Sequence, residues 1–496
     1  MSDHIPGDEI ERDEESAWRY SDKLTRRRFL KAGAAMAGAA AVGPLIFTTE
    51  DTWAGELFKN VSKSNLPYTA HTSVKGSISF WHHWASPLRH GTIKQIIRVF
   101  NHYYPHVAIH DTPFAFGDNW TKTLAAVAAG QGMPDVEVSN RPSLFWDAGR
   151  NHMYESLDDL VRRDHVSGKP FWPFTWSEAT KGGHAWGIPY ETDIRMLFWN
   201  RAKFIDAGMN SNKPPATWAE LKSYADKLDS KGGSYGGYNT PLAFALYKIG
   251  NGANLDTLVW TNGGGWQDRK QHPTFLNSRN LETAEWEKGW VDRYGGPNTL
   301  TLLNTKNTDS AHDPFGNQLV DMYINIPGQQ SVLKYYGVKF LPKSGKLIFP
   351  YWGMAPIPYN SAHKDNKPYS FSGGFSLSMP RNKHRSAATR DASWEMIKFF
   401  SLVGQKYWAE QTAAVPTVEA IAKNDQGLLS QDWWPNVLKA LKYGHPGESN
   451  KWDVNFPADV LGSATDDIMN GNKSAKDSLS AAQAQALQNM KKYGGP

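Results

Sequence analysis

Two carboxylates and an arginine alternate in one short segment, Glu191-Thr192-Asp193-Ile194-Arg195. In an extended strand, alternate side chains share one face at a spacing of about 7 Å, so Glu191, Asp193 and Arg195 would lie in a row. Two carboxyl groups on one face have the composition of an acid/base pair for glycoside hydrolysis. The alternative, which we favour, is that Arg195 neutralises the carboxylates and that one of them accepts a hydrogen bond from a ligand hydroxyl.

Histidines form a second group that could do chemistry. His82 and His83 are adjacent, and His106 and His110 follow. Imidazole nitrogens bind zinc, usually together with further ligands of acidic or thiolate type. Because His106 and His110 flank a predicted strand and no acidic partner is expected at ligand spacing, we predict no metal site. We likewise predict no catalytic residue and no cofactor.

The composition limits the chemistry further. Tryptophan has 21 copies in 496 residues, whereas cysteine is absent. The absence of cysteine excludes disulfides, thiolate metal sites, cysteine nucleophiles and a lipid-modified cysteine anchor. The net charge is +5, and Lys and Arg are scattered without a run of five, which is typical of a solvated surface rather than of a nucleic-acid-binding face.

The N-terminus has the pattern of a targeting segment. Thr25-Arg26-Arg27-Arg28-Phe29-Leu30-Lys31 precedes an uncharged stretch, residues 32–49. The motif resembles the twin-arginine export signal at all seven positions, with Arg26 and Arg27 as the arginine pair. The uncharged stretch is rich in Ala and Gly and is therefore a poor transmembrane helix. Retention by an uncleaved N-terminal anchor is the alternative.

Hydrophobic patterning next predicts strands and helices in alternation. Strands are expected at residues 78–81, 107–109 and 135–138. The helices between them have apolar stripes at helical spacing, which we expect to face the core; the stripes are Ile93, Ile96, Ile97 and Phe100 in the first helix and Trp120, Leu124, Val127 and Ala128 in the second. This βαβαβ order predicts a parallel sheet with ligands at the carboxyl ends of its strands.

A second α/β region begins near Met196–Trp199. It contains a helix that opens with the capping box Thr217-Trp218-Ala219-Glu220, and a closing amphipathic helix is expected at residues 479–490. No internal repeat or long linker interrupts residues 76–490. At about 150 residues per domain the length predicts two or three domains, and two α/β lobes in close contact fit this organisation.

Seven segments in this order carry a family resemblance: residues 78–84, 100–107, 125–136, 186–200, 214–221, 263–266 and 373–377. They resemble the extracellular solute-binding proteins of ABC importers, in particular the family 1 sugar binders related to maltose-binding protein. The resemblance implies a type 2 periplasmic-binding fold, in which two α/β lobes close over a cleft and the chain crosses between them three times. We expect the crossings near Tyr190–Arg195, Met354–Pro358 and Thr412–Pro416.

These crossings give a division of the whole chain. The signal and N-terminal segment occupy residues 1–54, and a polar tether occupies residues 55–75. The first lobe comprises residues 76–190 and 358–412, and the second comprises residues 195–354 and 416–496.

The resemblance also implies a function. We expect an exported, periplasmic or extracytoplasmic, monomeric receptor that binds a mono- or oligosaccharide and delivers it to the transmembrane subunits of an ABC permease. The Tat translocase would be its partner during export, and no nucleic acid is expected. The alternatives are an exported glycoside hydrolase using Glu191 and Asp193, and a receptor for a non-sugar solute.

A pyranose has an apolar ring face and a belt of hydroxyls, so its site needs aromatic platforms beside planar polar groups. We therefore select residues at strand ends, in glycine turns and at the first crossing as ligand-binding residues: Trp81, His83, Trp84, Asn140, Glu191, Asp193, Trp260, Trp266, Tyr323, Gly374 and Phe375. Gly374 is included because glycine lets a backbone approach a ligand closely. For the tryptophans the alternative is a place in the core, and for Asn140 it is a helix cap.

Overall fold

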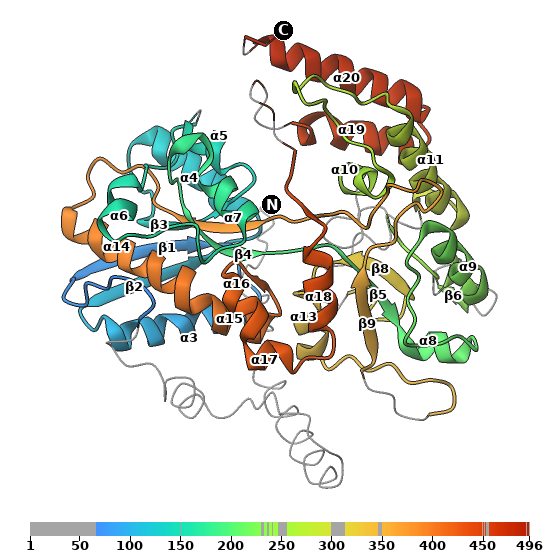
Figure 1. The fold of residues 1–496 in the computed structure, drawn as a ribbon, viewed down its shortest axis with the longest axis horizontal. Helices are drawn as coiled ribbons and strands as arrows, with labels where there is room; N and C mark the ends of the chain where they lie inside the picture. The colour runs from blue at the N-terminus through green and yellow to red at the C-terminus, as the bar shows by residue number, and fades with distance from the viewer. Residues whose placement is uncertain are drawn as a thin grey trace, which may run out of the picture. The chain divides into compact units, whose positions relative to one another are not determined.

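In the computed structural model, the predicted strand–helix alternation builds a six-stranded sheet with the order β12-β4-β11-β3-β1-β2 (Figure 1). Strand β1 (Gly76–His82) lies between β2 (Val107–Pro113) and β3 (Val136–Asn140) and is parallel to both. The other three strands come from later in the chain: β4 (Ile188–Thr192), β11 (Gly374–Ser378) and β12 (Val415–Pro416). Strand β11 is antiparallel to β3 and to β4. The predicted parallel βαβαβ unit is therefore confirmed.

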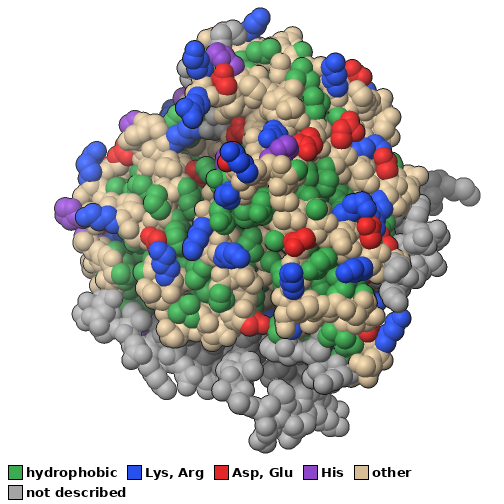
Figure 2. Space-filling model, turned by 45° about the vertical axis from the view of Figure 1, so that its right-hand side comes forward, with side chains coloured by type: hydrophobic (Ala, Val, Ile, Leu, Met, Phe, Trp, Pro, Cys, Tyr) green, Lys and Arg blue, Asp and Glu red, His purple; other side chains and the backbone are tan. Residues whose placement is uncertain are grey.

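The structure describes a defined part of the chain: residues 66–149, 151–229, 233–235, 238–240, 242–246, 255–298, 313–345, 350–448, 450, 452, 456–492 and 494–495. Arg26, Arg27 and the predicted anchor lie outside these residues. Within the described part, none of the helices combines the length and the hydropathy needed to cross a membrane. On the face shown in Figure 2, Lys and Arg side chains are scattered among Asp and Glu and are not gathered in one patch.

Helices cover both faces of the six-stranded sheet (Figure 1). Helix α3 (Pro87–Tyr103) buries the predicted stripe Ile93, Ile96, Ile97 and Phe100. It packs with α14 (Ala387–Phe399) and α15 (Gln405–Thr412) on one face. The helices on the other side are α4 (Asp118–Ala129), α5 (Leu144–Gly149) and α7 (Pro173–Ala179), whereas α6 (Asp158–Arg163) is joined to α14 by ion pairs. Together these elements form the first lobe.

Helix α4 differs from the prediction in the face that it buries. Leu124 is 41% exposed, whereas Asn119 and Thr123 are fully buried. The reason is the buried carboxyl of Glu137 on β3, whose Oε1 accepts hydrogen bonds from Asn119 Nδ2 and Thr123 Oγ1, both at 2.9 Å. Tyr154 donates to the other oxygen at 2.9 Å. Satisfying one buried polar group therefore outweighs burial of the apolar stripe of α4.

The second lobe is built on a three-stranded antiparallel sheet with the order β8-β5-β9. Its strands are β5 (Met196–Asn200), β8 (Met322–Asn325) and β9 (Trp352–Pro356). The surrounding helices are α8 (Arg201–Asp206), α9 (Trp218–Asp229), α10 (Leu255–Leu258), α11 (Ser278–Arg293), α13 (Gln329–Tyr335), α18 (Trp434–Leu441), α19 (Ala458–Met469) and α20 (Ala475–Lys492). Helix α9 begins with the predicted cap, since Thr217 Oγ1 accepts from Glu220 N at 3.2 Å. Helix α20 buries its predicted stripe.

The first of the three crossings lies between β4 and β5, at residues 193–195, within the predicted range. The second lies later than predicted. Beyond β9, Tyr359 and Asn360 still hydrogen-bond to the second lobe, and β10 (Ser370–Phe371) pairs with β13 (Gly444–His445). The chain therefore passes to β11 of the first lobe at residues 372–373 and not at residues 354–358.

The third crossing is also later than predicted. Strand β12 is an edge strand of the first-lobe sheet, and Glu419 N still donates to Pro170 O at 2.8 Å. The short helices α16 (Glu419–Asn424) and α17 (Gln426–Leu429) follow, and α18 then packs on β9. The crossing lies between Glu419 and Trp434, so the predicted lobe boundaries at residues 358 and 412–416 move later in the chain.

The end of the predicted tether is bound to the first lobe. Tyr68 OH lies 3.1 Å from Tyr104 OH, and His71 Nε2 lies 3.0 Å from Asp164 Oδ1. Lys398 Nζ, itself paired with Asp164, donates to the Thr69 carbonyl at 2.5 Å. Residues 68–71 are therefore part of the folded lobe.

We predict that Glu137 makes the stability of the protein fall as pH rises. Burial raises the pKa of Glu137 to about 8, so the folded state keeps a proton that the unfolded carboxyl releases near its ordinary pKa. Between these two values, stability decreases by up to about 1.4 kcal/mol per pH unit. Glu137→Gln should remove this slope, as measured by urea unfolding at pH 5, 6, 7 and 8. Equal slopes for the two proteins would contradict the prediction, and exposed Glu285→Gln on α11 is the control.

Candidate functional site

A cavity lies where the first crossing meets helix α15, strand β12 and the segment after β8. It is a small cavity of about 20 Å³ that is partly open to solvent. Both lobes contribute to its walls; the lining residues are Arg89, Glu191, Thr192, Asp193, Ile326, Pro327, Gly328, Trp408, Thr412, Ala414 and Val415. Two of the eleven predicted ligand-binding residues, Glu191 and Asp193, are in this wall. A cavity walled by two hinged lobes is the place where a small solute would be enclosed.

Glu191 is a half-buried acid in the wall of this cavity. Its Oε2 accepts a hydrogen bond from Trp408 Nε1, which extends from α15. Burial raises the pKa of Glu191 to about 7, and the nearby charge of Arg89 and the bond from Trp408 oppose that rise. Near neutral pH the carboxyl therefore has both protonation states within reach. It is a hydrogen-bonding group with little water around it.

Asp193 has different partners, although it stands only two residues further on. Its Oδ1 lies 2.5 Å from Arg195 NH1 and accepts a hydrogen bond from Gly373 N at 2.8 Å. The Arg195 guanidinium in turn lies over the Phe371 ring, 4.6 Å from its centroid. Arg195 thus pairs with Asp193, while Glu191 is held by Trp408. Asp193 joins the first crossing to the second, and nothing supports the hydrolase alternative.

Arg141, which directly follows β3, is fully buried beneath the cavity. Its Nε donates to Glu178 Oε2 at 2.7 Å, and NH1 donates to the Glu191 carbonyl at 2.7 Å. NH2 donates to Thr192 Oγ1 at 3.1 Å and to the carbonyl of Gly373. One guanidinium therefore binds the end of β4, the second crossing and one helix of the first lobe. We did not select it as a site residue, because an arginine in a loop carries no signal of its burial.

Gly374 is needed for the approach of two strands. It has a φ of +126°, and a Cβ at this position would overlap the Glu191 carbonyl and lie 2.8 Å from Thr192 Cα. Glycine is the residue that reaches this φ without strain. The close approach for which we selected Gly374 is thus an approach of β11 to β4.

An aromatic cluster adjoins the cavity at the carboxyl end of β1. Trp84 lies 4.5 Å from the Trp408 ring, and His83 lies 4.4 Å from Phe375 between ring centroids. Phe116 and Trp120, which we did not select, lie 5.0 and 5.4 Å from His83. The structure therefore brings together the predicted residues His83, Trp84 and Phe375.

His83 is the polar member of this cluster. Its side chain is 8% exposed, and neither ring nitrogen has a hydrogen-bond partner. Burial lowers the pKa of His83 well below its usual value, so the ring is neutral. An unpaired buried nitrogen costs about 1–3 kcal/mol, which a ligand hydroxyl bound to it would recover.

The other predicted residues lie elsewhere. Trp81 is half-buried on the face of β1 opposite His82 and packs 5.0 Å from Phe114. Asn140 is half-buried at the end of β3, in register with Phe375. Trp260 is 5% exposed, donates to Glu448 Oε1 at 3.0 Å and stacks on His445.

Trp266 and Tyr323 belong to the core of the second lobe. Both are fully buried, and Tyr323 stacks on Phe315 with centroids 4.7 Å apart. A ring covered on both faces offers no platform to a ligand. The glycine turn before Trp266 and the strand before Tyr323 gave no sign of this burial.

Two α/β lobes joined by crossing segments, with a cavity at the crossings, define the class of hinged solute-binding proteins. The family model of bacterial extracellular solute-binding proteins matches residues 95–437, and the chain belongs to this family. The twin-arginine motif and the export route were not part of that match.

Individual relatives are distant. The sn-glycerol-3-phosphate-binding periplasmic protein UgpB of Salmonella paratyphi A is 26% identical over 180 residues, which cover 34% of this chain and 39% of that protein. UgpB of Shigella dysenteriae serotype 1 is 23% identical over 376 residues, covering 69% of this chain and 75% of that protein. Among solved structures, CpMnBP1 with mannotriose bound is similar, with a TM-score of 0.69 and 23% identity over 83% of this chain and all of that chain. The predicted two-lobe α/β fold is confirmed.

We predict that Gly374→Ala destabilises the protein. A positive φ and a backbone clash act together, so the free energy of unfolding should fall by more than about 2 kcal/mol. Gly289→Ala is the matched control, since Gly289 lies within α11 with nothing within 4 Å of a Cβ; alanine there should be neutral or stabilising by up to about 1 kcal/mol. Urea unfolding measures both variants. A Gly374→Ala protein as stable as the parent would disprove the close approach.

Proposed function

We propose that this protein is the carbohydrate-binding component of an ABC importer and that it closes its two lobes over an uncharged saccharide. The observation that carries this proposal is the cavity at the crossings, which has walls from both lobes and buried hydrogen-bonding groups. A ligand in such a place touches both lobes and favours their closed arrangement. Non-catalytic binding, with no turnover of the sugar, is part of the proposal.

The charges of the cavity favour a neutral ligand. Two carboxylates, those of Glu191 and Asp193, line it together with one guanidinium, that of Arg89. Two further arginines nearby are paired with carboxylates, Arg141 with Glu178 and Arg195 with Asp193. A phosphate needs clustered cations or free backbone amides, so we place sugars ahead of glycerol phosphates, although UgpB relatives are named for such a ligand.

We propose a revised set of ligand-binding residues. It keeps Glu191, Asp193, His83, Trp84 and Phe375 from the sequence-based selection. It adds Arg89 and Trp408, which lie on helices α3 and α15. Trp260, Trp266, Tyr323 and Gly374 are left out because none of them lines the cavity or belongs to the aromatic cluster beside it, and Trp81 and Asn140 stay outside the set.

The cellular role is the finer part of the proposal. We infer that the protein is a monomer that docks on the two transmembrane subunits of its permease, and that the Tat translocase exports it. Members of its family are extracellular, which agrees with an extracytoplasmic place. The N-terminal segment 1–54 would then be the export signal, with retention by an uncleaved anchor as the alternative.

The ligand class can be tested by calorimetry. We expect micromolar binding of at least one sugar among mannotriose, maltose and lactose, and none of sn-glycerol 3-phosphate. Glu191→Gln should weaken sugar binding at least about tenfold, because a hydrogen bond to a charged group contributes about 1.5–3 kcal/mol. Glu285→Gln on the exposed side of α11 should leave it unchanged.

Two outcomes would reject this function. One is tight binding of glycerol phosphate without sugar binding, which would assign the cavity to an anion. The other is hydrolysis of an aryl glycoside that is lost in Glu191→Gln, which would make the protein an enzyme.

Export can be tested separately with the arginine pair. Replacing Arg26 and Arg27 by lysine should leave the precursor in the cytoplasm, because the twin-arginine signal needs both guanidinium groups. Arg28→Lys, at the variable position of the motif, is the matched control and should be exported. Cell fractionation with an antibody to the protein measures both, and unchanged export of the double variant would refute the assignment.

A further inference from the structure

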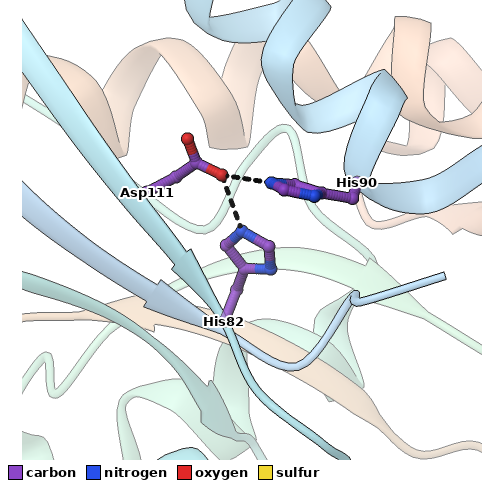
Figure 3. Close-up of side chains that lie close together, drawn as sticks. All are labelled: His82, His90 and Asp111. Atoms are coloured by element: carbon purple, nitrogen blue, oxygen red, sulfur yellow. Dashed lines mark hydrogen bonds and ion pairs between the residues drawn. The ribbon is translucent and has the colours of Figure 1, made fainter. Parts of the chain in front are cut away.

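Three side chains of the first lobe meet next to the proposed ligand site (Figure 3). Asp111 of β2 places one oxygen, Oδ2, 3.4 Å from Nε2 of His82 and 2.6 Å from Nε2 of His90. His82 ends β1 and is fully buried; His90 lies in the first turn of α3. The carboxylate therefore joins the end of a strand to the start of the next helix.

The proton positions in this cluster follow from a fourth group. The backbone N–H of Trp84 donates to Nδ1 of His82 at 3.2 Å. An amide nitrogen can only donate here, so Nδ1 holds no proton, and the neutral ring has its proton on Nε2, facing Asp111. Burial lowers the pKa of His82, which keeps the ring neutral. Hydrogen bonds therefore run without interruption from the Trp84 amide through His82 to Asp111.

These hydrogen bonds argue against a metal ion, although one nitrogen or oxygen atom of each side chain lies within 4.8 Å of those of the other two. A cation on Nε2 of His82 would force the proton of the neutral ring onto Nδ1. There it would point at the Trp84 N–H, and two donors would face each other. The three side chains therefore form a hydrogen-bonded cluster and not a metal site.

This cluster lies beside the turn that leads to the ligand cavity, because His82 precedes the turn and His90 follows it. Residues 83–86 connect β1 to α3; they include His83 and Trp84, and Arg89 follows in the first turn of the helix. Ser86, the N-cap residue of α3, makes no side-chain cap hydrogen bond, and the bond from His90 to Asp111 ties the first turn of the helix to β2. Trp84 then supports Trp408, 4.5 Å away between centroids, and Trp408 holds Glu191.

We propose that Asp111, with His82 and His90, is a positioning cluster for ligand binding, which holds Trp84 and Arg89 in place at the cavity. The proposal rests on the function proposed above. None of the three residues lines the cavity itself. Their effect reaches the ligand through the β1–α3 turn.

Matched variants separate the cluster from general stability. Asp111→Ala removes the oxygen that both histidines bind, and we expect it to weaken mannotriose or maltose binding about tenfold or more with only a small change in melting temperature. Asp118→Asn, exposed at the start of α4, should bind as the parent does. His90→Gln keeps a donor near the Nε2 position and should retain affinity, whereas His90→Ala should lose it. Equal affinity of Asp111→Ala and the parent would overturn the proposal.

Two measurements on the ligand-free protein decide the chemistry of the cluster. Nitrogen-15 NMR of the histidines should show His82 with its proton on Nε2. After EDTA treatment, calorimetry with ZnCl₂ should show no zinc binding that depends on Asp111. If the parent bound one equivalent of zinc and Asp111→Asn bound none, the cluster would be a metal site. If the parent binds no saccharide, the proposed function fails, and with it the role of the cluster in ligand binding. The NMR and zinc measurements would then still decide whether the cluster is held by hydrogen bonds.

Discussion

One buried guanidinium ties together the segments beside the cavity. Arg141 is enclosed by protein, and its nitrogens donate hydrogen bonds to Glu178 of α7, to the Glu191 carbonyl at the end of β4 and to the Gly373 carbonyl of the second crossing. Loss of this group would leave the Glu178 carboxylate without its buried partner, at a cost of about 1–3 kcal/mol. The end of β4, which carries Glu191 and leads into the first crossing, is thus bonded to the second crossing.

Around this guanidinium the two crossings are bonded directly to each other. Ser372 Oγ donates to the Asp193 carbonyl at 2.8 Å, and Ser370 Oγ both accepts from Arg195 N and donates to Arg195 O at 2.9 Å. Small hydroxyl residues and glycine occupy this region because the two backbones lie close together. Movement of the lobes would therefore take the form of a twist shared by two bonded segments.

Much of the fold could be predicted because periodic burial leaves a periodic sequence. The stripes of α3 and α20 and the parallel β1–β3 unit are local patterns of this kind. The face of α4 was wrong because its orientation depends on Glu137, a buried polar group outside the helix. The late second and third crossings depend on strand partners, β10 with β13 and β12 with β4, that are distant in sequence.

The candidate site could be predicted only in part. Glu191 and Asp193 were found because a charged alternation inside an apolar segment is conspicuous. Trp408 was missed and Trp266 was selected, because residue type does not tell whether a tryptophan in a helix or a turn has both faces covered. Residue type does not distinguish Arg89 from Arg141. Arg89 nevertheless lines the cavity, whereas Arg141 is hydrogen-bonded to β4 and to Gly373.

The attachment of residues 68–71 to the first lobe decides which part of the molecule would move. Tyr68 and Thr69 are bonded to Tyr104 and Lys398, so the first described residues of the chain are fixed to that lobe. A membrane link, a fused reporter or a surface support at this end would immobilise the first lobe. The second lobe would then move relative to the immobilised first lobe. A single-molecule measurement of the distance between the two lobes would record that movement.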